Sequence, residues 1–348
     1  MKKLYEILGQ RLNKGDVGVE IEVEGQRLPD DVDARWNATV DGSLRGENRE
    51  YVMRKPLPLA EVKDALTCLA QNLKDNKAKP DFSFRTSVHV HINCQELTYN
   101  QYLNFLYTYF LLEEPLMTFC GRERKGNRFC LRLQDAEGML ETFNRMFQFQ
   151  EEDGFAHIPP NKVRYSAMNI EATTKYGSLE FRGMKGNMDV DYINDWVMAI
   201  SYLRAFAQSV EDPTKVYDLY AELEAQGFME HVLKELAPKF YYARASRDVQ
   251  RSFSLSLDLP FRFGEQAAIR KAAQKRVAPR APKAMRVPDV IEPVQMPDPQ
   301  VVHAGIMRNN PAADILAQFN DPFARRLRAD AAPRAVPVRP RAIIRDEF

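Results

Sequence analysis

The sequence lacks long hydrophobic runs and has almost no net charge. None of its 348 residues lies in an apolar stretch of about 18 or more, the length that a membrane-spanning helix needs. Because 49 Lys and Arg balance 48 Asp and Glu, the formal net charge of +1 gives no overall attraction to nucleic acid or to an anionic membrane. The apolar part of the opening MKKLYEILGQ is too short and interrupted for a signal peptide. We therefore expect a cytoplasmic protein whose folded part binds neither membranes nor nucleic acid.

Cysteine is scarce, and its spacing is not that of a zinc ribbon. The chain has 4 cysteines, none of them in a C-x-x-C pair: Cys68, Cys94, Cys120 and Cys130. Because no small secreted frame surrounds them, reduced thiols are expected rather than disulfides.

A strand with an acidic face is predicted at Val17 to Gly25. Apolar and polar residues alternate in VGVEIEVEG, so the apolar side chains face a core and the glutamates line the opposite face. Glu20 and Glu22 would lie roughly 6.5 to 7 Å apart along the strand and repel each other unless cations lie beside them. Two divalent ions about 3.5 to 4 Å apart would fit there. The alternative is an antiparallel strand whose outer face is simply solvated.

A second alternating segment, Thr86 to Asn93, carries two histidines. On an extended strand Ser87, His89 and His91 share one face with Asn93. Two imidazoles at i and i+2 over an apolar reverse face indicate a metal or phosphate site. The alternative is a pair of histidines with purely structural partners.

Two further strands add acids and an arginine. Glu50 begins a short predicted strand, and Glu180 and Arg182 share the polar face of another over residues 178–182. A carboxylate and a guanidinium two residues apart can be cross-strand charge decoration. Beside the other acids and the histidines, the pair suggests an ion ligand next to an anion clamp.

Helices are predicted where apolar residues recur at helical spacing. They cover residues 59–76, 98–120, 135–152, 189–210, 214–225 and 228–236, and a strand with a hairpin connection is predicted at 163–171 and 173–177. After the second helix, four cations lie in a loop with two glycines: Arg122, Arg124, Lys125 and Arg128. Such a loop either closes over phosphates or a carboxylate, or is an ordinary solvated loop.

The composition changes beyond about Glu265. More than half of the 21 prolines lie after residue 270, and Arg and Ala dominate while aromatics become rare. Such a segment cannot bury enough apolar surface to fold by itself. We predict a catalytic domain over residues 1–264 and a disordered Pro/Ala/Arg-rich basic tail over 265–348, with a short helix at 312–328 that docks on a protein partner.

Taken in chain order, these motifs resemble those of the amidoligase family. They are G-x-E-x-E at residues 18–22, D-G-S at 41–43 followed by Glu50, H-x-H-x-N at 89–93, R-F-C at 128–130 and L-E-F-R at 179–182. Each motif is common, but their combination in this order over about residues 15–210 is specific. The family is grouped with glutamine synthetase and glutamate-cysteine ligase, which are ATP-dependent carboxylate-amine ligases. A glycine-rich phosphate loop and the separate amino-terminal domain of glutamine synthetase have no counterpart in the sequence.

The resemblance implies a role for each matching residue. It implies that two Mg²⁺ or Mn²⁺ ions are held by Glu20, Glu22, Glu50, His89 and Glu180. It assigns catalytic roles to Arg182, His91 and Arg128. It assigns ATP-binding roles to His91, Arg164, Arg182 and Asn93.

We therefore expect an α+β protein with a glutamine-synthetase-like catalytic domain. Its curved, largely antiparallel sheet would carry the metal site on the concave face and helices on the convex side. The expected activity is ATP- and Mg²⁺- or Mn²⁺-dependent amide formation, through an acyl phosphate, between a carboxylate and an amine of small-molecule or peptide size. Three alternatives stay open: a phosphotransferase on the same type of fold, a zinc hydrolase using His89 and His91, and a non-catalytic interaction protein.

Overall fold

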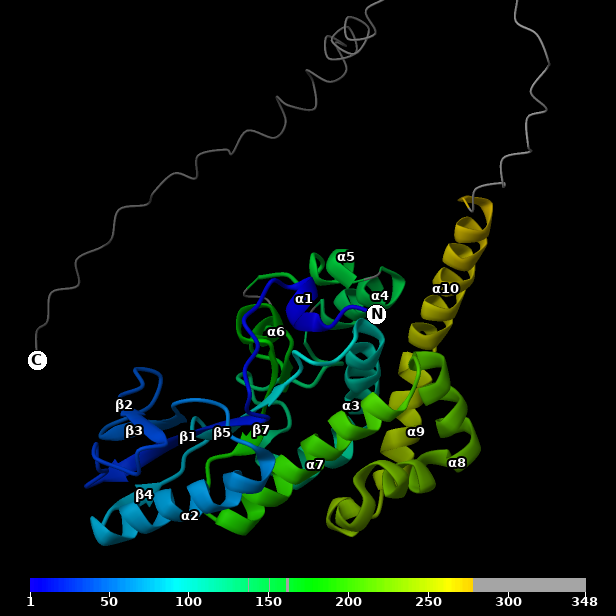
Figure 1. Ribbon diagram of the computed structural model, residues 1–348. Coiled ribbons are helices and arrows are strands. Elements are labelled where there is room, and N and C mark those ends of the chain that lie inside the picture. The colour runs from blue at the N-terminus through cyan, green and yellow to red at the C-terminus, as the bar shows by residue number, and fades with distance from the viewer. Residues whose placement is uncertain (137, 150, 161–162, 278–348) are drawn as a thin grey trace, which may run out of the picture. The chain divides into compact units, whose positions relative to one another are not determined.

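The computed structural model describes residues 1–136, 138–149, 151–160 and 163–277, and its strands form one open antiparallel sheet with helices packed on it (Figure 1). Its strands are β1 (Val17–Gln26), β2 (Trp36–Thr39), β3 (Asn48–Met53), β4 (Lys79–Asp81), β5 (Ser87–Asn93), β6 (Met168–Asn169) and β7 (Ser178–Lys185). Their order is β2-β3-β1-β5-β7-β6, with β4 beside β1 and every pair antiparallel. The mixed helix and sheet class expected from the sequence is therefore confirmed, and the sheet does not close.

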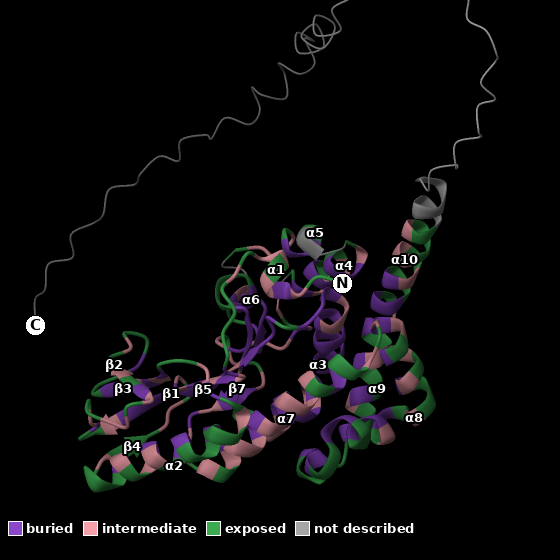
Figure 2. Ribbon diagram, viewed as in Figure 1, coloured by how far each residue is buried: buried purple, intermediate pink, exposed green. Residues whose placement is uncertain are grey.

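One face of the sheet is covered by three long helices. They are α2 (Leu59–Asp75), α3 (Tyr99–Cys120) and α7 (Val190–Ser209). The ring of Phe181 on β7 lies between two of them, with centroid distances of 5.6 Å to Phe105 and 5.2 Å to Tyr109 of α3, and 6.5 Å to Trp196 of α7. Figure 2 shows α3 buried along most of its length. The apolar half of each strand therefore forms the core, and the polar half faces away from these helices.

The remaining helices surround this core. They are α1 (Leu4–Ile7), α4 (Met139–Gln148), α5 (Glu151–Phe155), α6 (Glu171–Tyr176), α8 (Pro213–Leu233), α9 (Ala245–Ser256) and α10 (Asp258–Val277), with 3₁₀ turns at Arg122–Arg124 and Lys234–Phe240. In α10, Arg270 donates to the Gln148 carbonyl at 2.8 Å. This helix runs across the boundary predicted after residue 264, and residues 278–348, with the helix predicted at 312–328, lie outside the described residues. No helix in the described part of the chain has both the length and the apolar character needed to cross a membrane.

Two of the predicted elements are wrong around the site. The strand predicted at 163–171 is only the two-residue β6, and the predicted hairpin connection is the helix α6. The Asn169 side chain accepts from the Glu171 N–H at 3.0 Å, which turns the chain into α6, and Gly177 ends it with φ 75°. Because Ala172 and Thr173 are buried, tertiary packing stabilises this short helix.

Two predicted helix boundaries also differ. The helix predicted over 135–152 is interrupted, because Phe149 has extended backbone angles (φ −94°, ψ 165°) between α4 and α5. The helices predicted over 214–225 and 228–236 form one element, α8, with a break at Glu224 (φ 55°). Neither difference touches the polar face of the sheet.

Candidate active site

Strand register brings the acids and imidazoles to one face of the sheet. Residues directly opposite each other are Glu22 and Glu50 on β1 and β3, Glu20 and His89 on β1 and β5, and His91 and Glu180 on β5 and β7. Because side chains alternate along each strand, these residues all point away from the helical core. The face predicted from separate segments is therefore one continuous row across four strands.

A bulge in β7 lies next to this row. Between the pairs Val88–Met184 and Val90–Phe181, β7 has one residue more than β5, so Arg182 and Gly183 lie opposite His89 alone. A Cβ atom at Gly183 would lie 2.6 Å from the Met117 sulfur. Bulges bend a strand locally and re-aim its side chains, and glycine is the residue that fits here.

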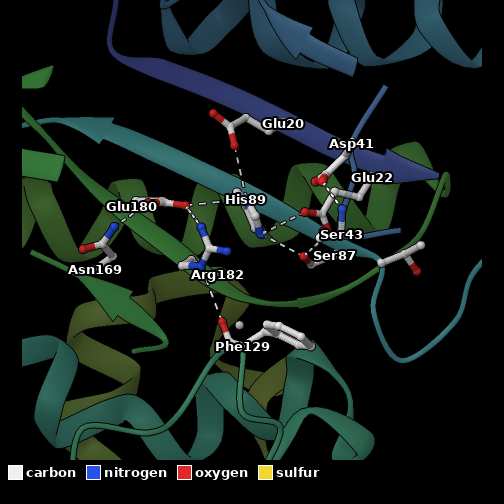
Figure 3. A network of polar contacts seen from close by, with 12 residues as sticks. Glu20, Glu22, Asp41, Ser43, Ser87, His89, Phe129, Asn169, Glu180 and Arg182 are labelled. Atoms are coloured by element: carbon white, nitrogen blue, oxygen red, sulfur yellow. Dashed lines mark hydrogen bonds and ion pairs between the residues drawn. The ribbon is translucent and has the colours of Figure 1, made fainter. Parts of the chain in front are cut away.

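His89 lies at the centre of the polar contacts and approaches side chains from three strands (Figure 3). Its Nδ1 lies 3.2 Å from Glu20 Oε2 and 3.5 Å from Glu180 Oε1, and its side chain is 3% exposed. On the other side, Ser87 Oγ lies 2.7 Å from His89 Nε2 and donates to Glu22 at 2.5 Å. Since the one hydroxyl proton goes to Glu22, Nε2–H of His89 is the donor to Ser87. The imidazole thus links carboxylates from β1 and β7.

His91 has a less satisfied environment. Its Nδ1 lies 3.1 Å from the Ser178 hydroxyl, and its buried Nε2 makes no hydrogen bond within the described residues, although Glu20 Oε1 lies 3.4 Å away. Burial would lower the pKa of His91, but Glu20 outweighs burial and raises it. Burial likewise would raise the pKa of Glu20, but contacts with both imidazoles hold it far below its usual value.

Glu180 is held between an arginine and an amide. Arg182 donates through Nη1 to Glu180 Oε1, and Asn169 donates to Oε2 at 2.7 Å. Burial would raise the pKa of Glu180, but Arg182, His89 and His91 together outweigh burial and lower the pKa. Arg182 also donates through Nε to the Phe129 carbonyl at 3.4 Å, so its guanidinium plane is fixed from two sides (Figure 3).

A third acidic group includes a residue from a loop. Carboxylate oxygens of Glu22, Asp41 and Glu50 lie within 4.8 Å of one another. Asp41 is oriented by the N–H of Ser43, which donates to it at 2.7 Å. Burial, followed by the charge of Glu20, raises the pKa of Glu50 to about 7. This is the expected effect of crowding carboxylates with too few cations between them.

The donor chemistry of the row fits divalent cations. Three overlapping groups each converge within 4.8 Å: Glu20, His91 and Glu180; Glu20, Glu50 and His89; and Glu22, Asp41 and Glu50. Each is rich in carboxylate oxygen, the ligand type that Mg²⁺ and Mn²⁺ prefer. The buried Nε2 of His91 has no hydrogen-bond partner among the described residues, so it is a further candidate ligand for a cation. Among the described residues, no converging group contains both histidines, so the alternative of a zinc site built from His89 and His91 together gains no support.

The row lies on the floor of a cavity of about 540 Å³. Its cationic lining residues are Arg85, Arg164, Lys175 and Arg182. Its apolar and aromatic wall is formed by Phe129, Phe155, Ile158, Tyr165 and Tyr176. A site with metal-type ligands, cations and an aromatic wall has the chemistry to bind a phosphorylated aromatic ligand.

The basic loop after α3 is anchored. Arg124 is 1% exposed and donates to the carbonyls of Arg182 at 3.1 Å and Gly183 at 3.2 Å. Lys125 pairs with Glu114 at 2.8 Å. Arg124 therefore holds the loop to β7, and Lys125 holds it to α3. The loop supports the site through its backbone, because the Phe129 carbonyl accepts a hydrogen bond from Arg182.

The structure brings together most of the predicted site residues. The cavity lining includes Glu20, Glu22, Glu50, His89, His91, Arg164, Glu180 and Arg182. Arg128 does not line it, because its exposed guanidinium stacks 4.8 Å over the Phe129 ring. The Asn93 amide donates to the carbonyls of Asn13 and Gly15, at 3.2 and 2.8 Å, and so holds a loop.

Sequence patterns pointed only partly to the other residues of the site. Ser87 belongs to the same alternation as His89, and Asp41 stands at a turn signal. Asn169 and Arg85 carry no local signal, since each joins the site through tertiary contacts. Glu24, the third acid of β1, lies off the cavity and accepts from the Arg45 N–H at 2.9 Å.

A row of carboxylates and imidazoles beside a fixed arginine combines ligand types that hold divalent cations with a group that binds anions. Residues 52–206 match the model of a family described as "Putative amidoligase enzyme", which confirms the resemblance carried by the motifs and supports a ligase-type enzyme. The match includes His89, His91, Glu180 and Arg182, whereas Glu20, Glu22 and Glu50 precede it.

Other comparisons are more distant. No curated protein matches the chain. Among solved structures, one similar chain is a bifunctional glutathione synthetase from Pasteurella multocida, with 11% sequence identity and a TM-score of 0.38. The alignment covers 75% of this chain and 49% of that one, so this chain spans about half the length of that protein.

Proposed function

We propose that the protein is an ATP- and divalent-metal-dependent carboxylate-amine ligase with a glutamine-synthetase-like catalytic domain. The observation that carries the proposal is the network of Glu20, His89, Glu180 and Arg182, which joins three strands over one cavity. When bound, Mg²⁺ or Mn²⁺ ions held by Glu20, Glu22, Asp41, Glu50, His89, His91 and Glu180 would neutralise phosphate charge.

The reaction would run in two balanced steps. A carboxylate oxygen of the first substrate forms a bond to the terminal phosphorus of ATP, and ADP leaves with the electron pair of the broken P–O bond. An amine then attacks the acyl carbon, inorganic phosphate leaves, and the amine nitrogen loses a proton. The product is an amide.

The chain's own residues would act mainly by position. Glu180 and the Phe129 carbonyl fix the plane of Arg182, so the guanidinium can bind the transferring phosphoryl group without reorganising. Asn169 holds the other oxygen of Glu180, which prevents the carboxylate from rotating. Preorganised charge of this kind is the main contribution that proteins make to phosphoryl transfer.

A nucleotide-binding measurement tests the proposal first. ATP with Mg²⁺ or Mn²⁺ should raise the melting temperature of the full chain, because a ligand that binds only the folded state stabilises it. ADP release should then appear with members of a panel of amino acids and small carboxylates. No thermal shift with any ATP–metal pair would contradict the proposal and favour a non-catalytic interaction protein.

A further inference from the structure

A second cavity adjoins the first across Glu20 and His91. It also measures about 540 Å³, and the residues common to both cavities are Glu20, His91, Lys175 and Tyr176. Cavities of roughly 300 to 1,000 Å³ are typical of small-molecule sites. The metal-type ligands therefore have a substrate-sized space on each side.

The end of α6 and the residue after it lie where the two cavities meet. Gln10 donates through Nε2 to the carbonyls of Thr173 and Thr174, both at 2.9 Å, which caps this short helix. Gly177 follows with φ 75°, and a Cβ atom there would lie 2.4 Å from Gln95 Cγ. The backbone that carries Lys175 and Tyr176 is thus held in place by these contacts. The boundary between the two cavities is therefore a fixed feature of the fold.

The second cavity carries cations without acidic partners. Arg11, Arg54 and Lys55 line it together with Lys175, and none of the four forms an ion pair within the described residues. The acids that line this cavity contact other residues instead of these four cations. Asp16 lies 3.4 Å from an Arg204 nitrogen, and Glu20 contacts both imidazoles. A concave surface with uncompensated positive charge attracts anions.

The two cavities differ in their other lining groups. The first has an aromatic wall, whereas the described residues that line the second include Tyr176 as their one Phe, Tyr or Trp and carry amides such as Asn13 and Gln95. Arg54 is oriented by its Nε, which donates to the Trp36 carbonyl at 2.9 Å. Polar groups and several cations, of which Arg54 is oriented, suit a small, hydrophilic anion rather than a nucleobase.

We propose that the second cavity binds the carboxylate-bearing substrate, while the nucleotide occupies the first. This inference rests on the proposed ligase function. It assigns the substrate to a multiply charged carboxylate, held by Arg54 and Lys55, with its reacting end directed toward Glu20 and His91.

Isothermal titration of the full chain tests this assignment with three probes: ADP with Mg²⁺, inorganic phosphate, and the dipeptide L-glutamyl-L-glutamate. The test variant is Arg54→Gln with Lys55→Gln, and the matched control is Arg164→Gln in the first cavity. The double variant should bind the dipeptide at least about tenfold more weakly, as expected for loss of charge-assisted hydrogen bonds. Its ADP affinity should stay within about twofold of wild type, and the control should show the reverse pattern.

Three results would overturn the assignment. They are no dipeptide binding to wild type, dipeptide affinity unchanged in the double variant, and loss of ADP affinity in the double variant. If phosphate binding responds to the double variant and dipeptide binding does not, the second cavity is a phosphate site instead. Failure of wild type to bind ADP at all would count against the ligase proposal itself, and so is distinguishable from these outcomes.

Discussion

Glu20 on β1 and His89 on β5 lie directly opposite each other, with Nδ1 of His89 3.2 Å from Oε2 of Glu20. His91 lies on the other side of the same carboxylate at 3.4 Å. Glu20 therefore has an imidazole on each of two sides before any cation binds. These cross-strand contacts between carboxylates and imidazoles offset part of the repulsion among the carboxylates on this face of the sheet.

Metal affinity should depend on Glu20 and not on Glu24. Glu20→Gln removes a ligand shared by two of the converging groups, so Mn²⁺ affinity should fall about tenfold or more. Glu24→Gln is the matched control, because Glu24 lies on the same strand but off the cavity. Titration of Mn²⁺ followed by electron paramagnetic resonance measures both. Equal affinities in the two variants would place the ions elsewhere.

The stability of the metal-free protein should depend on the charge of Glu50. Its pKa is raised from 4.5 to about 7, so neutral Glu50 favours the folded state, and this contribution is lost as pH rises through 7. Glu50→Gln should therefore stabilise the protein relative to wild type above pH 7, with little difference at pH 4.5. Urea unfolding at pH 4.5, 6 and 8 measures the change. A difference that does not grow with pH would contradict the raised pKa.

The alternation of β1 and β5 was enough to predict one face of the site. Glu20, Glu22, His89 and His91 were found because a strand has a period of two residues, which a sequence displays directly. The register between strands has no such local signal. It is this register that places Asn169 opposite Glu180 and lets Asp41 approach Glu22.

Two differences between the sequence-based expectations and the structure depend on tertiary packing. Residues 171–176 were predicted as the end of a strand and a hairpin turn, but they form α6, because a buried face and Gly177 outweigh weak local propensity. The resemblance implied a catalytic role for Arg128 through the R-F-C motif, and its side chain lies outside the cavity. The structure instead uses the Phe129 carbonyl, which no sequence pattern of side chains reveals.

Replacing Arg182 with lysine should sharply lower the catalytic rate. Lysine keeps the charge but loses the planar fork, so an interaction made mainly in the transition state is lost. We expect Arg182→Lys to lower kcat about 100-fold or more while changing the KM for ATP little. Arg128→Lys, whose side chain lies outside the cavity, should keep wild-type kcat. Steady-state ADP release measures both variants, with folding checked by circular dichroism; equal kcat values would return the Glu180–Arg182 pair to a structural role.

The catalytic unit should extend to the end of α10. We propose that a chain ending at Val277 keeps the melting temperature and nucleotide binding of the full chain. A chain ending at Phe263 loses the contact of Arg270 with Gln148. Its melting temperature should fall by several degrees, since 1 kcal/mol corresponds to about 2 to 4 °C in a domain of this size. Thermal unfolding of both truncated proteins decides between this boundary and the one predicted at residue 264.

Trapping of the activated carboxylate tests the central claim most directly. Hydroxylamine attacks an acyl phosphate to give a hydroxamate, so wild type incubated with ATP, Mg²⁺ and an accepted carboxylate should form hydroxamate and ADP in equal amounts. Arg128→Lys should behave like wild type, and Arg182→Lys should lose both products together. A stable phosphorylated product without hydroxamate would identify a phosphotransferase, and turnover that needs no nucleotide but stops with a zinc chelator would identify a hydrolase; either result would contradict the ligase account.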